Sequence, residues 1–283
     1  MLDTMEWFVL SLFFVTTMAG IGLQVNLRDL SAMVQRKGLL VRSLLVNFLV
    51  IPALGLAATW LVPMTPTSAD AILMLACAPG GLSAIQFTSK RKDVLAFAGQ
   101  TAFLLTALSI FLSPALMSLL RPTDLPLNVP YAKSFLLIVV YLVVPMGLGV
   151  FFRERRERQA DRLGRFVAVI GTVAFVVFVI MTLSTRQAAM AALGNGEVEA
   201  MLGFIVATMI VGWLAGGPQL ETREVLASAS SMRNVALCLM IVTRSFPDSG
   251  VELPLVACSA LMIPPNLLFL IATVALKKIR RKA

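Results

Sequence analysis

Residues 221–246 decide how this chain folds, and their sequence is ETREVLASASSMRNVALCLMIVTRSF. Both ends of this segment are apolar, yet its middle holds Ser230, Ser231, Met232, Arg233 and Asn234. A charged side chain at bilayer depth costs at least about 2.5–3.5 kcal/mol, so it usually faces a cavity or a partner. Ser and Asn favour helix caps over helix interiors. The segment therefore predicts two half-helices that meet at a polar break, with Asn234 or Ser231 capping the second.

The composition indicates that the surrounding medium is a bilayer. Apolar residues make up 58% of the 283 residues and charged residues 14%, whereas about a quarter of a soluble domain is charged. The first six residues carry Asp3 and Glu6 where a signal peptide needs positive charge, so no signal peptide is expected. The sequence therefore predicts an all-α, multi-pass integral membrane protein in which residues 1–283 form a single membrane unit.

The apolar segments long enough to cross a bilayer number nine, at about 20 residues each. They are Glu6–Val25, Gly38–Val62, Ala69–Ser89, Val94–Leu120, Tyr131–Phe152, Leu163–Leu183, Val198–Gly216, Leu220–Arg244 and Val251–Leu276.

Basic residues follow the first, third, fifth and ninth of these spans. They are Arg28, Arg36, Lys37, Lys90, Arg91, Lys92, Arg153, Arg155, Arg156, Arg158, Arg162, Arg165, Lys277, Lys278, Arg280, Arg281 and Lys282. Positive loops stay cytoplasmic, so the N-terminus is expected outside and the C-terminus inside, in a bacterial inner membrane. The net charge of +9 then needs no nucleic acid to explain it, and anionic lipid is a secondary partner.

Several classes of site are not expected. The chain has no histidine, no nucleophile beside a base and no phosphate loop, so we expect neither an enzyme nor a cofactor. The cysteines Cys77, Cys238 and Cys258 lack the paired spacing of a disulfide framework or a zinc site. They are interpreted as small apolar residues between helices, and no metal site is predicted.

A second interruption lies in the third span, at Ala78-Pro79-Gly80-Gly81-Leu82-Ser83. Taken singly, Pro followed by two glycines is a kink or a close-packing point. Two interruptions at equivalent places instead indicate that spans one to four repeat as spans six to nine, in the opposite sense. Inverted repeats with broken helices at matching positions indicate a secondary transporter with a midplane site.

Four short motifs resemble the bile acid:sodium symporter family. They are Cys77-Ala78-Pro79-Gly80-Gly81, the crossing segment from Ser231 to Leu237, Ile51-Pro52 in the second span and Gly20-Ile21-Gly22-Leu23 in the first. The resemblance covers nearly the whole chain and implies two broken helices that cross near the midplane. It also implies a core domain (residues 38–120 and 197–276) and a panel domain (5–25 and 131–185), whose relative motion gives alternating access for an organic anion.

The resemblance also implies where the substrate binds. The candidate substrate-binding residues are Ser230, Ser231, Arg233, Asn234, Gly80, Gly81, Ser83 and Gln86.

The chain departs from the family at the sodium sites. Ala229 stands where sodium-binding members have a glutamate, Arg233 stands where they have a glutamine, and Ala84-Ile85 replaces their Ser-Asn. Asn47, Thr101 and Ala229 are the candidate remnants of an ion site. Sodium needs a carboxylate and several oxygens, and an arginine in the same cavity repels it. Sodium coupling of the usual kind is therefore not expected.

Two roles remain open for Arg233. Its guanidinium can act as a tethered cation in the space of the missing ion, paired with carbonyls at the end of the Glu221–Ser230 half-helix. Alternatively it can take a substrate carboxylate or sulfonate bidentately. The half-helix N-termini near Leu82 and Asn234 favour an anion in either case.

Three functions are weighed. The first is an organic-anion carrier that does not use sodium in the usual way. The second is an arsenite-type efflux carrier of the same architecture, although the mid-membrane glutamate on which such carriers rely is missing here. The third is a membrane sensor that kept the fold without transport.

Overall fold

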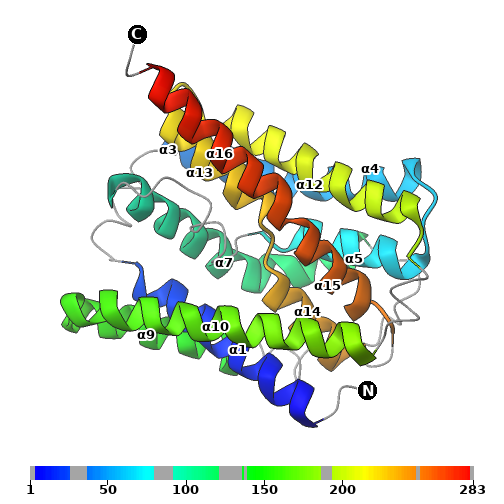
Figure 1. Cartoon of the computed structure of the whole chain (residues 1–283), viewed down its shortest axis with the longest axis horizontal. Coiled ribbons are helices and arrows are strands. Elements are labelled where there is room, and N and C mark those ends of the chain that lie inside the picture. The colour runs from blue at the N-terminus through cyan, green and yellow to red at the C-terminus, as the bar shows by residue number, and fades with distance from the viewer. Residues whose placement is uncertain are drawn as a thin grey trace.

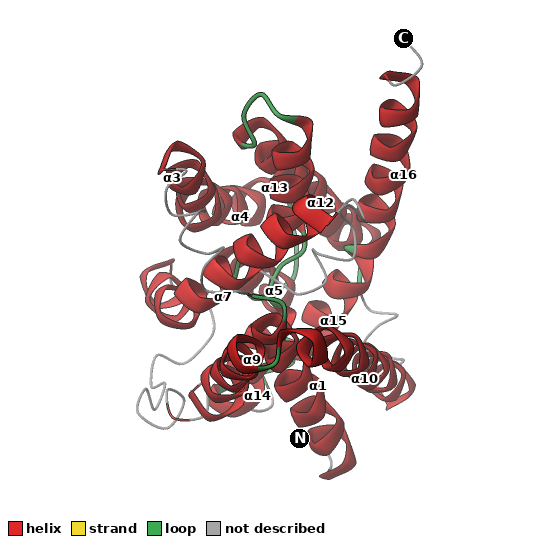
Figure 2. Ribbon diagram, turned by 90° about the vertical axis from the view of Figure 1, so that its left-hand side faces the viewer, coloured by secondary structure: helices red, strands yellow, loops and turns green. Residues whose placement is uncertain are grey.

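The computed structural model describes residues 4–25, 37–79, 92–120, 136, 139–185, 193–246 and 249–280. Every regular element among these residues is a helix, and none of them forms a strand (Figure 2). This confirms the all-α prediction.

The helices have the following bounds. They are α1 (Thr4–Leu23), α3 (Lys37–Leu45), η1 (Val46–Val50), α4 (Ile51–Leu61), α5 (Pro66–Cys77), α7 (Lys92–Leu120), η2 (Val139–Val143), α9 (Val144–Arg155), α10 (Glu157–Thr185), α12 (Asn195–Ala215), α13 (Leu220–Ser231), α14 (Val235–Ser245), α15 (Glu252–Leu261) and α16 (Ile263–Arg280).

Six helical segments within the described residues are long and apolar enough to cross a membrane. They are Thr4–Leu23, Lys37–Leu61, Phe97–Leu120, Asn195–Ala215, Leu220–Thr243 and Glu252–Lys277. The other three predicted spans fall on α5, on η2 with α9, and on α10. The apolar helix of α5 is only 12 residues long because it ends at Cys77, before Pro79. A count of nine spans thus remains a prediction.

Two π-helical turns share one sequence pattern. In η1 the Ile51 N–H donates to the Val46 carbonyl, and Pro52 follows at once. In η2 the last residue is Val143, and Pro145 stands at the same place after it. A proline has no N–H for the regular helical ladder, so the helix widens just before it. Asn47 lies in the first of these turns.

One group of helices consists of α1, α9 and α10, which lie together at the bottom of Figure 1. Glycines allow their backbones to meet closely. A Cβ built on Gly149 of α9 would stand 2.6 Å from the Ala19 carbonyl oxygen of α1. A Cβ on Gly171 of α10 would stand 2.9 Å from the Thr16 Oγ1. Arg153 closes the far end by donating to the carbonyl of Leu23 at 2.8 Å.

The remaining helices surround the broken segment. Helix α12 packs along α13, and α5 contacts α4, α7 and α15. Every residue from Glu224 to Val242 is buried, so α13 and α14 lie at the centre of the molecule (Figures 1 and 2). The first residues of α1 and the last of α16 lie at opposite ends of the molecule in Figure 1.

Candidate functional site

The predicted break in residues 230–234 is present. Helix α13 ends at Ser231, Met232 is extended, and α14 begins at Val235. The Asn234 side chain accepts a hydrogen bond from the Leu237 N–H at 3.1 Å, so Asn234 is the cap, one of the two residues predicted for this role.

The first interruption meets the second one. Helix α5 ends at Cys77, and the Asn234 N–H donates to the carbonyl of Ala78 at 2.9 Å. Non-helical backbone from two segments far apart in the sequence is therefore paired inside the protein. Such backbone survives at membrane depth only when it is buried in protein or lines a cavity.

Arg233 is 2% exposed and ties the two interruptions together. Its Nε donates to the Leu75 carbonyl at 2.8 Å and its Nη2 to the Ala76 carbonyl at 2.6 Å. Its Nη1 donates to Asn47 Oδ1 at 2.8 Å and to the Ser230 carbonyl at 3.3 Å. The guanidinium is thus held by four hydrogen bonds inside the protein.

The predicted carbonyl partners of Arg233 were only partly right. We expected carbonyls at the end of α13, and Ser230 supplies one, but the shorter bonds go to Leu75 and Ala76 at the end of α5. The last carbonyls of a helix have no partner within that helix and carry its partial negative charge. Because α5 stops beside the break, its end is within reach of the guanidinium.

Asn47 and Ser230 extend this network. Asn47 Nδ2 donates to the Ser43 carbonyl at 3.0 Å and to Ser230 Oγ at 3.2 Å. The candidate ion-site remnant Asn47 is therefore bonded both to Arg233 and to Ser230. Thr101 on α7 donates to Phe97 of its own helix, and no hydrogen bond joins it to this network among the described residues. Ala229 is buried one residue before Ser230.

Ser231 contacts a residue that the sequence reading missed. Its Oγ donates to Asn266 Oδ1 at 2.8 Å, which links α13 to α16, and Asn266 Nδ2 donates to the Met262 carbonyl at 2.9 Å. Asn266 is fully buried. An amide side chain in an apolar span directly after Pro264-Pro265 is a signal that could have identified it.

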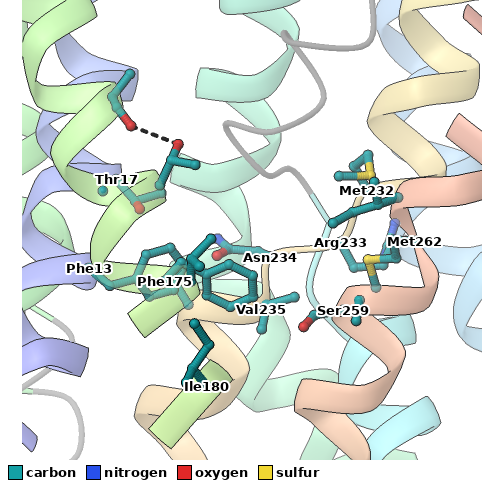
Figure 3. A pocket seen from close by; sticks show the side chains of 17 residues that line it. Phe13, Thr17, Phe175, Ile180, Met232, Arg233, Asn234, Val235, Ser259 and Met262 are labelled. Atoms are coloured by element: carbon teal, nitrogen blue, oxygen red, sulfur yellow. Dashed lines mark hydrogen bonds between the residues drawn. The ribbon is translucent and has the colours of Figure 1, made fainter. Parts of the chain in front are cut away.

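A cavity of about 280 Å³ lies between the α1–α10 wall and the second break (Figure 3). Phe13 and Thr17 come from α1 and Phe175 from α10, whereas Met232 to Ala236 and Met262 form the opposite side. The lining is mostly apolar. Arg233 lines the cavity, but none of its four hydrogen-bond partners does, so its guanidinium points behind the wall.

Asn234, one of the residues that line this cavity, carries a polar group without a partner among the described residues. The residue is 2% exposed, and its Nδ2 has no hydrogen-bond partner in the part of the chain that the structure describes. The side chain extends from the break toward Phe175 in Figure 3. Its Oδ1 is held as the cap of α14, so the buried N–H₂ group is the half of the amide left for another partner. A buried donor without a partner costs free energy, so a ligand acceptor there would relieve that cost.

The four candidate residues Gly80, Gly81, Ser83 and Gln86 lie outside the described residues. No group of three or more metal-binding side chains occurs within the described ranges. The three cysteines are buried and form no disulfide.

An ion pair joins Glu224 of α13 to Lys277 of α16 at 2.6 Å. The sequence analysis assigns Lys277 only a role in orientation, but this residue also links two helices.

A model of the Sodium Bile acid symporter family matches residues 9–193, which is more than half of the chain. The matched region begins within α1 and ends two residues before α12, which starts at Asn195. The second break, at residues 230–234, lies outside it. A search among curated proteins gives no match.

Proposed function

The chain belongs to the Sodium Bile acid symporter family, and from that premise we propose that it carries an organic anion across the membrane by alternating access without sodium coupling. The carrying observation is the Nδ2 of Asn234, which has no partner among the described residues and belongs to a residue that lines a cavity beside the buried charge of Arg233.

In this proposal the chain crosses the membrane nine times, with the N-terminus outside and the C-terminus in the cytoplasm. The opposite ends reached by α1 and α16 support an odd number of crossings. The paired interruptions at Ala78 and Asn234 support an inverted repeat. Helices α1, α9 and α10 form the panel, and the broken helices with their neighbours form the core. The cavity between the two groups is where alternating access requires a substrate site.

Three features favour an anion in the cavity. Asn234 Nδ2 donates directly to the bound group, and the N-terminus of α14, which begins at Val235, adds its positive dipole end. Arg233 adds a full positive charge just behind the wall. We assign Arg233 the role of a tethered cation. Its four internal hydrogen bonds support this role better than they support bidentate binding of the substrate.

The same arginine accounts for sodium independence. Its guanidinium takes up Asn47 Oδ1 and three carbonyl oxygens, which are the kind of ligands that a sodium ion prefers. Because Ala229 carries no carboxylate, no negative side chain at that position neutralises this fixed cation. The substrate anion is then attracted by a positive charge that is always present behind the cavity wall.

The cavity also limits the substrate. At about 280 Å³ it lies just below the roughly 300–1,000 Å³ of sites for drug-sized ligands. Its mostly apolar lining, with the free donor of Asn234 among the described residues, suits a small amphipathic carboxylate or sulfonate. The candidate residues Ser230, Ser231, Gly80, Gly81, Ser83 and Gln86 complete the proposed site, the two serines through their support of Asn47 and Asn266.

Uptake into proteoliposomes tests this function. Radiolabelled anions, from pyruvate to taurocholate, and arsenite are offered to the reconstituted protein and to Asn234→Asp. This variant keeps the cap oxygen but replaces the free donor by a negative oxygen. We expect uptake of at least one organic anion by the parent and its loss in the variant. Arsenite uptake would favour the efflux carrier, and no uptake of any compound would favour the sensor.

A further inference from the structure

The segment around the junction of α9 and α10 is rich in positive charge. Residues 153–165 contain six arginines and three acidic residues, which gives a net charge of +3. In Figure 1 this segment lies at the left, on the same side as the end of α16.

Within the described residues only Arg153 of this group forms an ion pair, while Arg155 stacks over the Phe151 ring at 4.2 Å. Arg153, whose side chain is 15% exposed, donates from Nη1 to Asp161 Oδ1 at 2.8 Å, and its Nη2 lies 3.9 Å from Glu157 Oε1. It thus engages two of the three acids of the segment. The other five arginines are exposed and have no ion pair with any described residue; they are Arg155, Arg156, Arg158, Arg162 and Arg165.

Three of these arginines lie on one stripe of α10. Arg158, Arg162 and Arg165 follow at i, i+4 and i+7, which places them on a single face over about 10 Å of helix. The same face continues as Phe166, Val169 and Val173, each more than half exposed. The opposite face carries the buried Ala160, Gly164 and Gly171, and the two glycines meet α1.

The exposed apolar part of this face meets the acyl chains of the lipid. The arginines at its N-terminal end therefore lie at the headgroups of the same leaflet rather than in an aqueous cleft. Guanidinium groups bind phosphate bidentately. We propose that the arginine stripe of α10 (Arg158, Arg162 and Arg165) is a binding site for an anionic phospholipid whose tails lie along Phe166, Val169 and Val173.

This site lies on the helix that supplies Phe175 to the cavity. A lipid held there anchors the α1–α9–α10 group in its leaflet. The binding does not depend on which substrate, if any, the protein carries.

Binding is measured by native mass spectrometry and by thermal shift on the purified full chain, titrated with phosphatidylglycerol, phosphatidylcholine or inorganic phosphate. The test variant is Arg162→Gln/Arg165→Gln. The matched control is Lys37→Gln/Arg42→Gln, which removes the same charge from exposed positions of α3.

We expect phosphatidylglycerol to bind at least tenfold more tightly than phosphatidylcholine, with the preference weakening as salt rises. The affinity for phosphatidylglycerol should fall at least tenfold in the test variant and less than twofold in the control. An equal fall in both variants, equal binding of both lipids, or equal binding of inorganic phosphate would each overturn the proposal. Arg162→Lys/Arg165→Lys, which keeps the charge and the fold, should recover part of the affinity.

Discussion

Replacing Arg233 by glutamine tests the tethered-cation role most severely. The guanidinium serves four acceptors, which are the carbonyls of Leu75, Ala76 and Ser230 and the Oδ1 of Asn47. A glutamine amide ends near the place of the arginine Nε, so at best it reaches Leu75. The acceptors at Ala76 and Asn47 then stay buried without a donor.

Each buried acceptor without a partner costs about 1–3 kcal/mol, and breaking a buried charged network costs about 3–5 kcal/mol. We therefore expect Arg233→Gln to lose about 3–5 kcal/mol of stability. For a chain of this size that corresponds to a fall in Tm of roughly 6–20 °C.

The assay is thermal unfolding of the purified protein in one detergent, followed by tryptophan fluorescence. The control is Arg158→Gln, because Arg158 is exposed and has no ion pair with a described residue, so that change should cost less than about 0.5 kcal/mol. If Arg233→Gln melted within about 2 °C of the parent yet lost its substrate, Arg233 would be a recognition residue and not a tethered cation.

Three further changes have distinct outcomes. Asn234→Asp keeps the cap oxygen, so it should melt close to the parent while anion affinity in a thermal-shift titration falls at least tenfold; Asn234→Ala should also lose about 1 kcal/mol through the cap. Lys277→Met leaves the buried Glu224 uncompensated and should cost about 3–5 kcal/mol in denaturant unfolding. Glu224→Gln should cost less, because the Lys277 side chain can reach water. A larger loss in Glu224→Gln than in Lys277→Met would contradict the pairing. Gly149→Ala places a Cβ 2.6 Å from the Ala19 oxygen and should destabilise by about 1–3 kcal/mol, whereas Gly147→Ala meets nothing within 4 Å and should not; equal effects would show that α1 and α9 are not in close contact.

The local features of the site could be predicted from the sequence. The polar residues 230–234 within an apolar segment indicated the break, and an asparagine before an apolar run indicated the cap. These predictions depend on neighbours within one or two helical turns, where the pattern of the chain is sufficient. The burial of Arg233 followed from the cost of an exposed charge at that depth.

The partners of Arg233 could not be predicted in the same way. Leu75 lies 158 residues away in the sequence, so its proximity depends on how α5 and α13 pack. The same holds for the link from Ser231 to Asn266 and for the α10 wall of the cavity at Phe175. Sequence periodicity determines which face of a helix is buried but not which helix it meets.

The central claim is that the fixed charge of Arg233 replaces the coupling ion. The direct measurement is the initial rate of uptake, into proteoliposomes, of an anion that the parent protein transports, with sodium outside and then with equal potassium. The account predicts rates that agree within about twofold. A tenfold stimulation by sodium, which corresponds to about 1.4 kcal/mol of linkage, would contradict it and show that oxygens near Asn47 and Thr101 still form a sodium site.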